Sequence, residues 1–330
     1  MPYRFKLDEK VRDGFIRIAH EQIERAQAEL TGASSIQSAV HETRKCLKRI
    51  RALLRLVRPG LTEKIFKREN RAIRDIAALL SEARDNHVLL ETIAKLEARK
   101  ADAPLMNLKR LAFAGCSAHG VAEDPGRTAA ALAGLRAVEE RLRKISIEPA
   151  SFTTLRRGYE RTYAHARRAI AGAYKKNASE AFHELRKHIQ IHWRHTQLLS
   201  RAWPEIMEAH AAAARELSQI LGDDHDLAVL EAFLARAPKG EIGKMEARLV
   251  RKAIRERQGE LRELAIARLE RLFAERPPEM GRRIERQWKA AKRLSQDKLV
   301  NAGTAKRESI VSQAPAATEA ESEPRSGRAA

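Results

Sequence analysis

Cysteine is scarce in this sequence, and long apolar runs are missing from it. Cys46 and Cys116 are the only cysteines among 330 residues. They can form one disulfide at most and show neither C-x-x-C nor zinc-site spacing, which excludes a disulfide-rich scaffold and a zinc finger. The sequence has no stretch of about eighteen apolar residues, and its first ten residues contain no apolar signal core. We therefore expect a cytoplasmic protein without a membrane span.

Glycine-rich phosphate loops are missing as well. The sequence contains no G-x-x-x-x-G-K-[ST] and no G-x-G-x-x-G after a strand, which excludes the backbone cradles that hold phosphate at the start of a helix. Any phosphate would therefore be held by side chains. Arginine suits this task because its guanidinium makes forked contacts to phosphate, whereas lysine acts as a point charge.

Acidic and aromatic residues are few relative to basic ones. The chain has 64 Lys and Arg against 44 Asp and Glu, a net charge of +20 and a pI near 10.3. Such an excess indicates a polyanionic partner, which could be nucleic acid, an acidic membrane or polyphosphate. Aromatic residues make up only 5% of the chain. Because proteins that bind single-stranded nucleic acid usually stack bases on aromatic rings, this scarcity favours a ligand with phosphates and no bases.

Helix formers dominate what is present. Apolar residues return every three or four positions, and strand patterns are almost absent, which predicts an all-α fold. Helices are expected over about 8–31, 36–58, 62–80, 83–100, 104–116, 125–144, 152–174, 178–200, 204–220, 224–236, 241–275 and 279–296. From about Asn301 the chain has almost no large apolar residues, so residues 301–330 are predicted to form a disordered tail.

The stretch 40–58 carries two separate stripes when it is drawn as a helix. One stripe is apolar, and the other lies roughly 130° away and consists of potential cations with no acidic residue in the row. The cations are His41, Arg44, Lys45, Lys48, Arg51 and Arg55. A solvated basic face is the plain alternative. However, like charges at i,i+4 repel and the pattern recurs later in the chain, so we interpret the row as an anion-binding face.

This pattern is part of an internal repeat. The letters HETRK at 41–45 match HELRK at 183–187, and LLSEARDNHVLL downstream of the first motif corresponds to ILGDDHDLAVL downstream of the second. A repeat of long period indicates duplicated structure. We predict one domain over residues 1–300, made of two four-helix-bundle-like halves, about 8–148 and 150–296. An approximate two-fold axis would relate them, so that the two basic helices could face each other.

The second basic helix carries less charge than the first. One face holds His183, Arg186, Lys187, Gln190 and Arg194, and Gln190 aligns with Lys48. We therefore expect the second half to bind anions more weakly, and a helix end with exposed His and Arg is the alternative. Each of the two motif histidines could donate to an anion or could anchor neighbouring helices, and the sequence leaves both roles open.

The pair His225-Asp226 invites comparison with a metal-dependent phosphohydrolase. That chemistry needs further ligands that converge on the metal, and the aligned pair in the first half is Arg84-Asp85. We predict instead that both aspartates lie near the start of a helix, where a carboxylate is favoured. Arg84 and His225 would then face the ligand or pair with an acid. We expect no metal and no cofactor.

At these residues the sequence resembles the CHAD family, the conserved histidine α-helical domain. The resemblance rests on HETRKCLKRIR, LSEARDNHVLL, FHELRKHIQIHW and LGDDHDLAVL, and it covers roughly residues 8–295. It implies two four-helix bundles with pseudo-two-fold symmetry, polyphosphate bound in a basic central groove or pore, and no established enzymatic activity. The acidic E-x-E-x-K strand of a CYTH triphosphatase domain is missing, so the chain looks like a stand-alone member. It departs from the usual second-half pattern at Gln190 and Arg194.

We therefore predict a non-enzymatic protein that binds inorganic polyphosphate in the cytoplasm, with polyphosphate granules as one place where it could be found. The alternative is a nucleic-acid-binding or architectural protein that uses the same basic face. The sequence makes no prediction of oligomeric state. The candidate binding residues are His41, Arg44, Lys45, Lys48, Arg49, Arg51, Arg55, Arg84, His183, Arg186, Lys187, Arg194 and His225.

Overall fold

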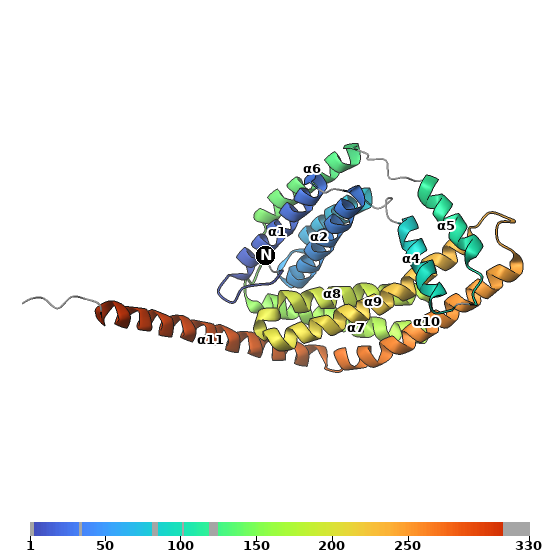
Figure 1. Cartoon of the computed structure of the whole chain (residues 1–330). Coiled ribbons are helices and arrows are strands. Elements are labelled where there is room, and N and C mark those ends of the chain that lie inside the picture. The colour runs from blue at the N-terminus through green and yellow to red at the C-terminus, as the bar shows by residue number, and fades with distance from the viewer. Residues whose placement is uncertain (1–2, 33–34, 81–84, 101, 119–124, 313–330) are drawn as a thin grey trace, which may run out of the picture.

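The structure of the chain, a computed structural model, describes residues 3–32, 35–80, 85–100, 102–118 and 125–312, without the side chains of 36, 85–87, 115–118, 125 and 298–312. Every regular element in these ranges is a helix (Figure 1), so the predicted all-α class is confirmed. The elements are α1 (Val11–Gly32), α2 (Ile36–Val57), η1 (Arg58–Gly60), α3 (Glu63–Leu79), α4 (Asp85–Glu97), α5 (Met106–Ala118), α6 (Pro125–Arg143), α7 (Phe152–Lys176), α8 (Ser179–Leu198), η2 (Ser200–Ala202), α9 (Pro204–Ala235), α10 (Lys244–Leu272) and α11 (Pro277–Ser312).

Helices α1, α2, α3 and α6 form the first bundle. Helix α2 packs against α1 and α3, and α6 packs against the same two helices. The apolar stripe predicted for residues 40–58 is buried on α2, where Leu47, Ile50 and Leu54 are at most 1% exposed. Thr62 caps α3 by accepting a hydrogen bond from the backbone N–H of Ile65, which satisfies one of the free donors of a first helical turn.

Helices α7, α8, α9 and α10 form the second bundle, and α11 lies along α7. In this second bundle, tyrosine hydroxyl groups form hydrogen bonds with backbone carbonyls of other helices. The Tyr163 hydroxyl donates to the carbonyl of Leu272 at 3.2 Å, and the Tyr174 hydroxyl donates to the carbonyl of Arg262 at 2.7 Å. These bonds tie α7 to α10 and remove the penalty of burying an unpaired polar group.

The hairpin of α4 and α5 belongs to the first half of the sequence, but it packs on the second bundle. Helix α4 contacts α9 and α10 (Figure 1). Lys95 of α4 pairs with Asp223 of α9 at 2.9 Å, and Arg110 of α5 pairs with Glu241 just before α10. The chain thus crosses from the first bundle to the second and returns with α6.

The two bundles meet where α2 crosses α7 and α8. A Cβ on Gly158 of α7 would lie 1.7 Å from the carbonyl oxygen of Leu56, so the close approach of these backbones requires glycine. Beside this crossing, His195 Nε2 lies 2.8 Å from the carbonyl oxygen of Ala52, and its Nδ1 lies 2.9 Å from the Thr162 hydroxyl. One buried imidazole therefore joins α2, α7 and α8.

One predicted helix break is wrong. Helix α9 continues from Pro204 to Ala235 through the glycine and aspartates at 222–224. The apolar stripe that includes Leu217, Leu221 and Leu227 stays buried across this point, so packing overrides the weak helix propensity of Gly and Asp. Asp226 consequently lies inside a helix, contrary to our prediction, whereas Asp85 is the first residue of α4.

The end of the last helix also differs from the prediction. Helix α11 continues to Ser312 and does not end near residue 296, because Ala, Lys, Arg and Glu in this stretch sustain a helix. The first part of the segment predicted to be disordered is therefore helical, and residues 313–330 lie outside the described residues. The division into halves at about 148 and their two-fold relation stay predictions.

Burial lowers the pKa of seven histidines below the ordinary value, and all of them lie in the second bundle. They are His165, His183, His188, His192, His195, His210 and His225. For His195 burial is the largest cause, opposed by the bond to Ala52 and reinforced by Arg55 and Arg194, and its pKa is about 3. The fold therefore keeps these imidazoles neutral at pH values where an unfolded chain would protonate them.

We predict that acid destabilises the fold through His195. Below its ordinary pKa of 6.5 the unfolded chain binds a proton that the folded chain binds only near pH 3. The stability from the neutral imidazole is therefore complete above pH 6.5 and is lost as the pH falls toward 3, at about 1.4 kcal/mol per pH unit. Urea unfolding between pH 7 and about 4.5 measures this loss. The variant His195→Gln should be less stable at pH 7 but less sensitive to acid, and equal pH slopes for the two proteins would contradict the prediction.

Candidate basic groove

A cavity of about 400 Å³ lies between the two bundles, with α2 on one side and α8 and α9 on the other. We call it the basic groove. The described residues that line it are Arg44, Lys48, Arg51, Ala52 and Arg55 of α2, Val88 of α4, His183, Arg186, Lys187, Gln190, Ile191 and Arg194 of α8, and His225, Asp226 and Val229 of α9. The two basic helices predicted from the repeat therefore contribute to the same cavity.

The cations of α2 line the groove because they repeat at helical spacing on one face. Neighbouring neutral oxygens hold their guanidinium groups in place. Arg44 Nη1 donates to the carbonyl of Ala77 at 3.1 Å, and Arg51 Nε donates to the Asn70 side-chain oxygen at 3.2 Å. Arg55 Nη1 donates to the carbonyl of Arg51 at 3.1 Å. Such bonds orient a guanidinium without neutralising its charge.

Two histidines from different helices meet in the groove. His183 Nδ1 of α8 and His225 Nδ1 of α9 are 3.0 Å apart, and their ring centroids are 4.1 Å apart. Only one of the two facing nitrogens can carry the shared proton. Burial, then His183 and Arg186, lower the pKa of His225 to about 4, so the pair is neutral near pH 7.

The α8 side of the groove is partly neutralised by carboxylates. Arg186 Nη1 lies 3.9 Å from Asp226 Oδ1, and Lys187 forms an ion pair with Glu184 one turn earlier. On α2, by contrast, the acidic Glu42 pairs with Lys45, outside the cavity lining. The groove residues Arg51 and Arg55 of α2 bond to neutral oxygens instead.

Two arginines that line the groove are cations without a carboxylate partner among the described residues. Arg194 is 8% exposed, bonds to the carbonyl of Gln190 and lies against the Trp193 ring. Burial, then Arg51 and Arg58, lower the pKa of Arg55 to about 10. Burial is also the main cause that lowers the pKa of Arg194 to about 10. Both remain protonated at neutral pH, so the groove holds positive charge that no carboxylate of the described ranges pairs with.

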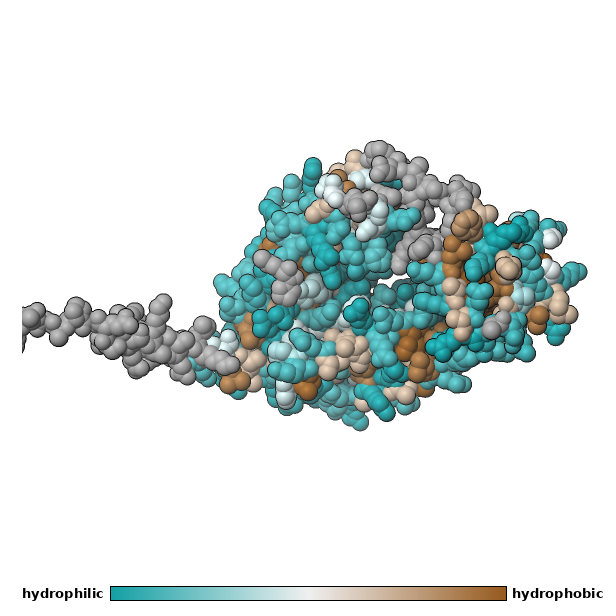
Figure 2. Space-filling view, viewed as in Figure 1, coloured by the Kyte–Doolittle hydropathy of each residue, from teal (hydrophilic) through white to brown (hydrophobic). Residues whose placement is uncertain are grey.

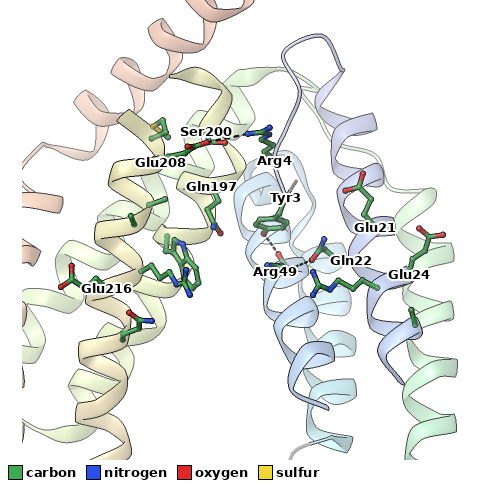
Figure 3. Close-up of a pocket in the computed structure, with 18 residues that line it drawn as sticks. Tyr3, Arg4, Glu21, Gln22, Glu24, Arg49, Gln197, Ser200, Glu208 and Glu216 are labelled. Carbon is green, nitrogen blue, oxygen red and sulfur yellow. Dashed lines mark hydrogen bonds and ion pairs between the residues drawn. The ribbon is translucent and has the colours of Figure 1, made fainter. Parts of the chain in front are cut away.

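A larger cavity of about 1010 Å³ opens on the other side of α2. Figure 3 shows Tyr3, Gln22 and Arg49 on one wall and Gln197, Glu208 and Glu216 on the other. The Tyr3 hydroxyl donates to the Arg49 carbonyl at 2.7 Å, and Arg49 Nη1 donates to Gln22 at 3.2 Å. Because glutamates and arginines are both numerous in this lining, its charge is balanced, unlike that of the basic groove.

The structure brings most of the predicted binding residues together, but not all. Arg44, Lys48, Arg51, Arg55, His183, Arg186, Lys187, Arg194 and His225 line the basic groove. Arg49 lines the other cavity, and Lys45 pairs with Glu42 at 2.7 Å. His41 lies one turn before Arg44 and is half-buried outside the lining. Arg84 lies outside the described residues.

Some lining residues were not predicted. Asp226 was assigned to a helix start, and the aliphatic residues Ala52, Val88, Ile191 and Val229 were not considered. Ala52 lies among the α2 cations at i+4 from Lys48, so its spacing could have placed it on the basic face. Val88 follows no such rule, because it reaches the groove only through the packing of α4 on α9.

The surface in Figure 2 is largely hydrophilic, and hydrophobic residues gather where α5 and α10 lie.

Within the described ranges, no three His, Cys, Asp or Glu side chains form a group that could hold a metal ion. Over the same residues, no helix has the length and apolar character to cross a membrane.

The fold resembles that of a solved structure. PptA from Streptomyces chartreusis superimposes with a TM-score of 0.53 at 13% identity, over 81% of this chain and all of that one. At this identity the likeness concerns the fold alone. Comparison with curated proteins finds no match.

A sequence model of the CHAD domain matches residues 17–235, which is well over half of the chain. The match spans the whole of α2, α4, α8 and α9, the helices that supply the groove. The chain belongs to the CHAD domain family.

We predict that replacement of Arg55 by Met does not destabilise the fold. The half-buried side chain of Arg55 would be replaced by one of similar length without the charge. Replacement of a buried charge by an apolar group is often neutral or stabilising by about 1–4 kcal/mol, and a half-buried position should give less. Calorimetry should therefore show an unchanged or higher Tm, by a few degrees at most. The control Lys64→Met removes an exposed cation of α3 and should leave Tm unchanged. A clear fall in Tm for Arg55→Met would contradict the idea that its charge is uncompensated.

Proposed function

We propose that the protein binds inorganic polyphosphate in the basic groove and does not transform it. The observation that carries the proposal is the pair Arg55 and Arg194, two protonated arginines with no carboxylate partner among the described residues. They come from the two basic helices and line one cavity. A bound polyanion would supply the missing negative charge from both sides at once.

The chemistry of the lining supports polyphosphate over nucleic acid. Cations, imidazoles and aliphatic side chains make up most of the lining, which suits a chain of phosphates. The indole of Trp193, which could stack on a base, lines the other cavity. Membership of the CHAD family supports the same ligand, since the resemblance of the sequence to that family implies polyphosphate binding.

The groove should draw more affinity from α2 than from α8. Arg51 and Arg55 bond to neutral oxygens, so their full charge is available to phosphate. Arg186 and Lys187 each lie near a carboxylate that competes for them. The weaker anion binding that we expect of the second half, because Gln190 stands where the first half has Lys48, thus has a second physical reason. Nearby carboxylates partly neutralise the charges of Arg186 and Lys187.

We predict that Arg51→Gln combined with Arg55→Gln lowers the affinity for polyphosphate by at least about tenfold at physiological salt. Each lost phosphate contact should also reduce the salt slope of log K by about one unit, if the rule for nucleic acids applies to this polyanion. Titration calorimetry with polyphosphate of defined length, at several salt concentrations, measures both quantities.

The matched control is Lys45→Gln combined with Arg49→Gln. This variant removes the same charge from the same helix but outside the basic groove. Screening over about 8 Å should limit its effect to two- or threefold. Equal losses for the two variants would mean that net charge, and not the groove, drives binding. Competition with RNA and duplex DNA at one salt concentration tests the alternative ligand, because polyphosphate should displace both and resist displacement.

We further predict that the protein releases no orthophosphate from polyphosphate or from a nucleoside triphosphate. The described groove residues offer one carboxylate, Asp226, which lies near Arg186. A malachite-green assay with Mg²⁺ present should give the background rate, and Asp226→Ala should not change it. Release that disappears in Asp226→Ala would sink the non-enzymatic assignment.

A further inference from the structure

A small cavity of about 240 Å³ adjoins the basic groove between α4, α9 and α10. Its lining holds three cations, Lys95, Arg99 and Arg257, and two carboxylates, Asp223 and Asp226. Asp226 lines both this cavity and the basic groove. The carboxylate therefore stands at the boundary between two places where cations gather.

Asp226 is unusual in its surroundings. Among the described lining residues of the basic groove it is the one carboxylate. Its Oδ1 lies 3.9 Å from Arg186 Nη1, and its negative charge also acts on Lys95 in the small cavity. Lys95 itself bonds to Asp223 at 2.9 Å, and Arg257 bonds to Glu260 at 2.7 Å.

A fixed carboxylate opposes the passage of a phosphate chain. Every phosphate of a polyphosphate carries negative charge, and like charges repel strongly where protein excludes water. A chain that follows the cations of α2 and α8 would meet this repulsion at Asp226. Asp226 lines both cavities, so a phosphate chain that extended from the basic groove toward the small cavity would pass close to its carboxylate.

We infer that Asp226 is an end stop, which confines a bound polyphosphate chain to the basic groove and keeps it out of the cavity lined by Lys95, Arg99 and Arg257. This inference rests on the proposed function. Asp226 determines specificity by limiting how many consecutive phosphates the protein can contact, so it sets the chain length beyond which affinity stops rising.

The test compares the full chain with Asp226→Asn, which keeps the shape of the side chain and removes its charge. Affinities are measured by titration calorimetry at one salt concentration for tripolyphosphate and for long-chain polyphosphate of defined length. Removal of a negative charge raises the affinity for any anion, so the informative quantity is the difference between the two ligands. We expect the gain to be at least about fivefold larger for the long chain.

A double-mutant cycle identifies the path of the extra phosphates. Arg99→Gln combined with Arg257→Gln should change long-chain affinity less than about twofold in the parent, because the chain does not reach these residues. In the Asp226→Asn background the same pair should abolish the gain. Melting temperatures of all variants verify that the fold is intact.

Three results would overturn the end stop. Weaker binding of both ligands by Asp226→Asn would mean that Asp226 positions Arg186. Equal gains for the short and the long ligand would mean a local charge effect only. No difference from the parent for either ligand would mean that the chain does not approach Asp226. If the parent protein binds no polyphosphate of either length, the proposed function fails together with the inference.

Discussion

The crossing of α2 with α7 is the constraint on which the arrangement of the molecule depends. Gly158 allows the two backbones to meet, since any side chain there would collide with the carbonyl of Leu56. Once this contact is made, α8 is held beside α2 by the bond from His195 to Ala52. The basic faces of α2 and α8 can then line the same cavity. The position of an uncharged, buried crossing thus sets the distance between two rows of cations.

Those rows oppose the stability of the fold. Burial, and then the neighbouring Arg51 and Arg58, lower the pKa of Arg55. Arg194 is buried without a compensating carboxylate among the residues that the structure describes. The protein therefore keeps two arginines charged in surroundings that would favour their neutral forms or the binding of an anion beside them. Functional sites commonly hold groups in such unfavourable surroundings. The large cavity on the other side of α2 shows the contrast, because there each kind of charge is matched by the other.

Much of the fold and part of the site could be predicted from the sequence. Helical periodicity gave the all-α class and most helix bounds, and the repeat of HETRK placed α2 and α8 in one site. Periodicity left Arg49 off the basic row, since it lies about 100° round the helix from Lys48. Arg49 became a candidate only through the resemblance of HETRKCLKRIR to the CHAD family, and the structure places it in the other cavity. The continuity of α9 through Gly222 was also hidden, since burial of its leucines overrides local propensity. For the same reason Asp226 was placed at a helix start and not in the groove.

The packing of α4 and α5 on α9 and α10 bears on how the chain can be divided. Although the sequence reads as two similar units, a fragment that ended after the first unit would carry α4 without the surface it rests on, and the remaining fragment would lack both α2 and the hairpin. Neither piece could enclose the cavity between the bundles. The smallest unit that can evolve with this cavity is therefore the two bundles together. A cut or a recombination event near residue 148 would separate α2 from α8 and α9, which line the cavity from opposite sides.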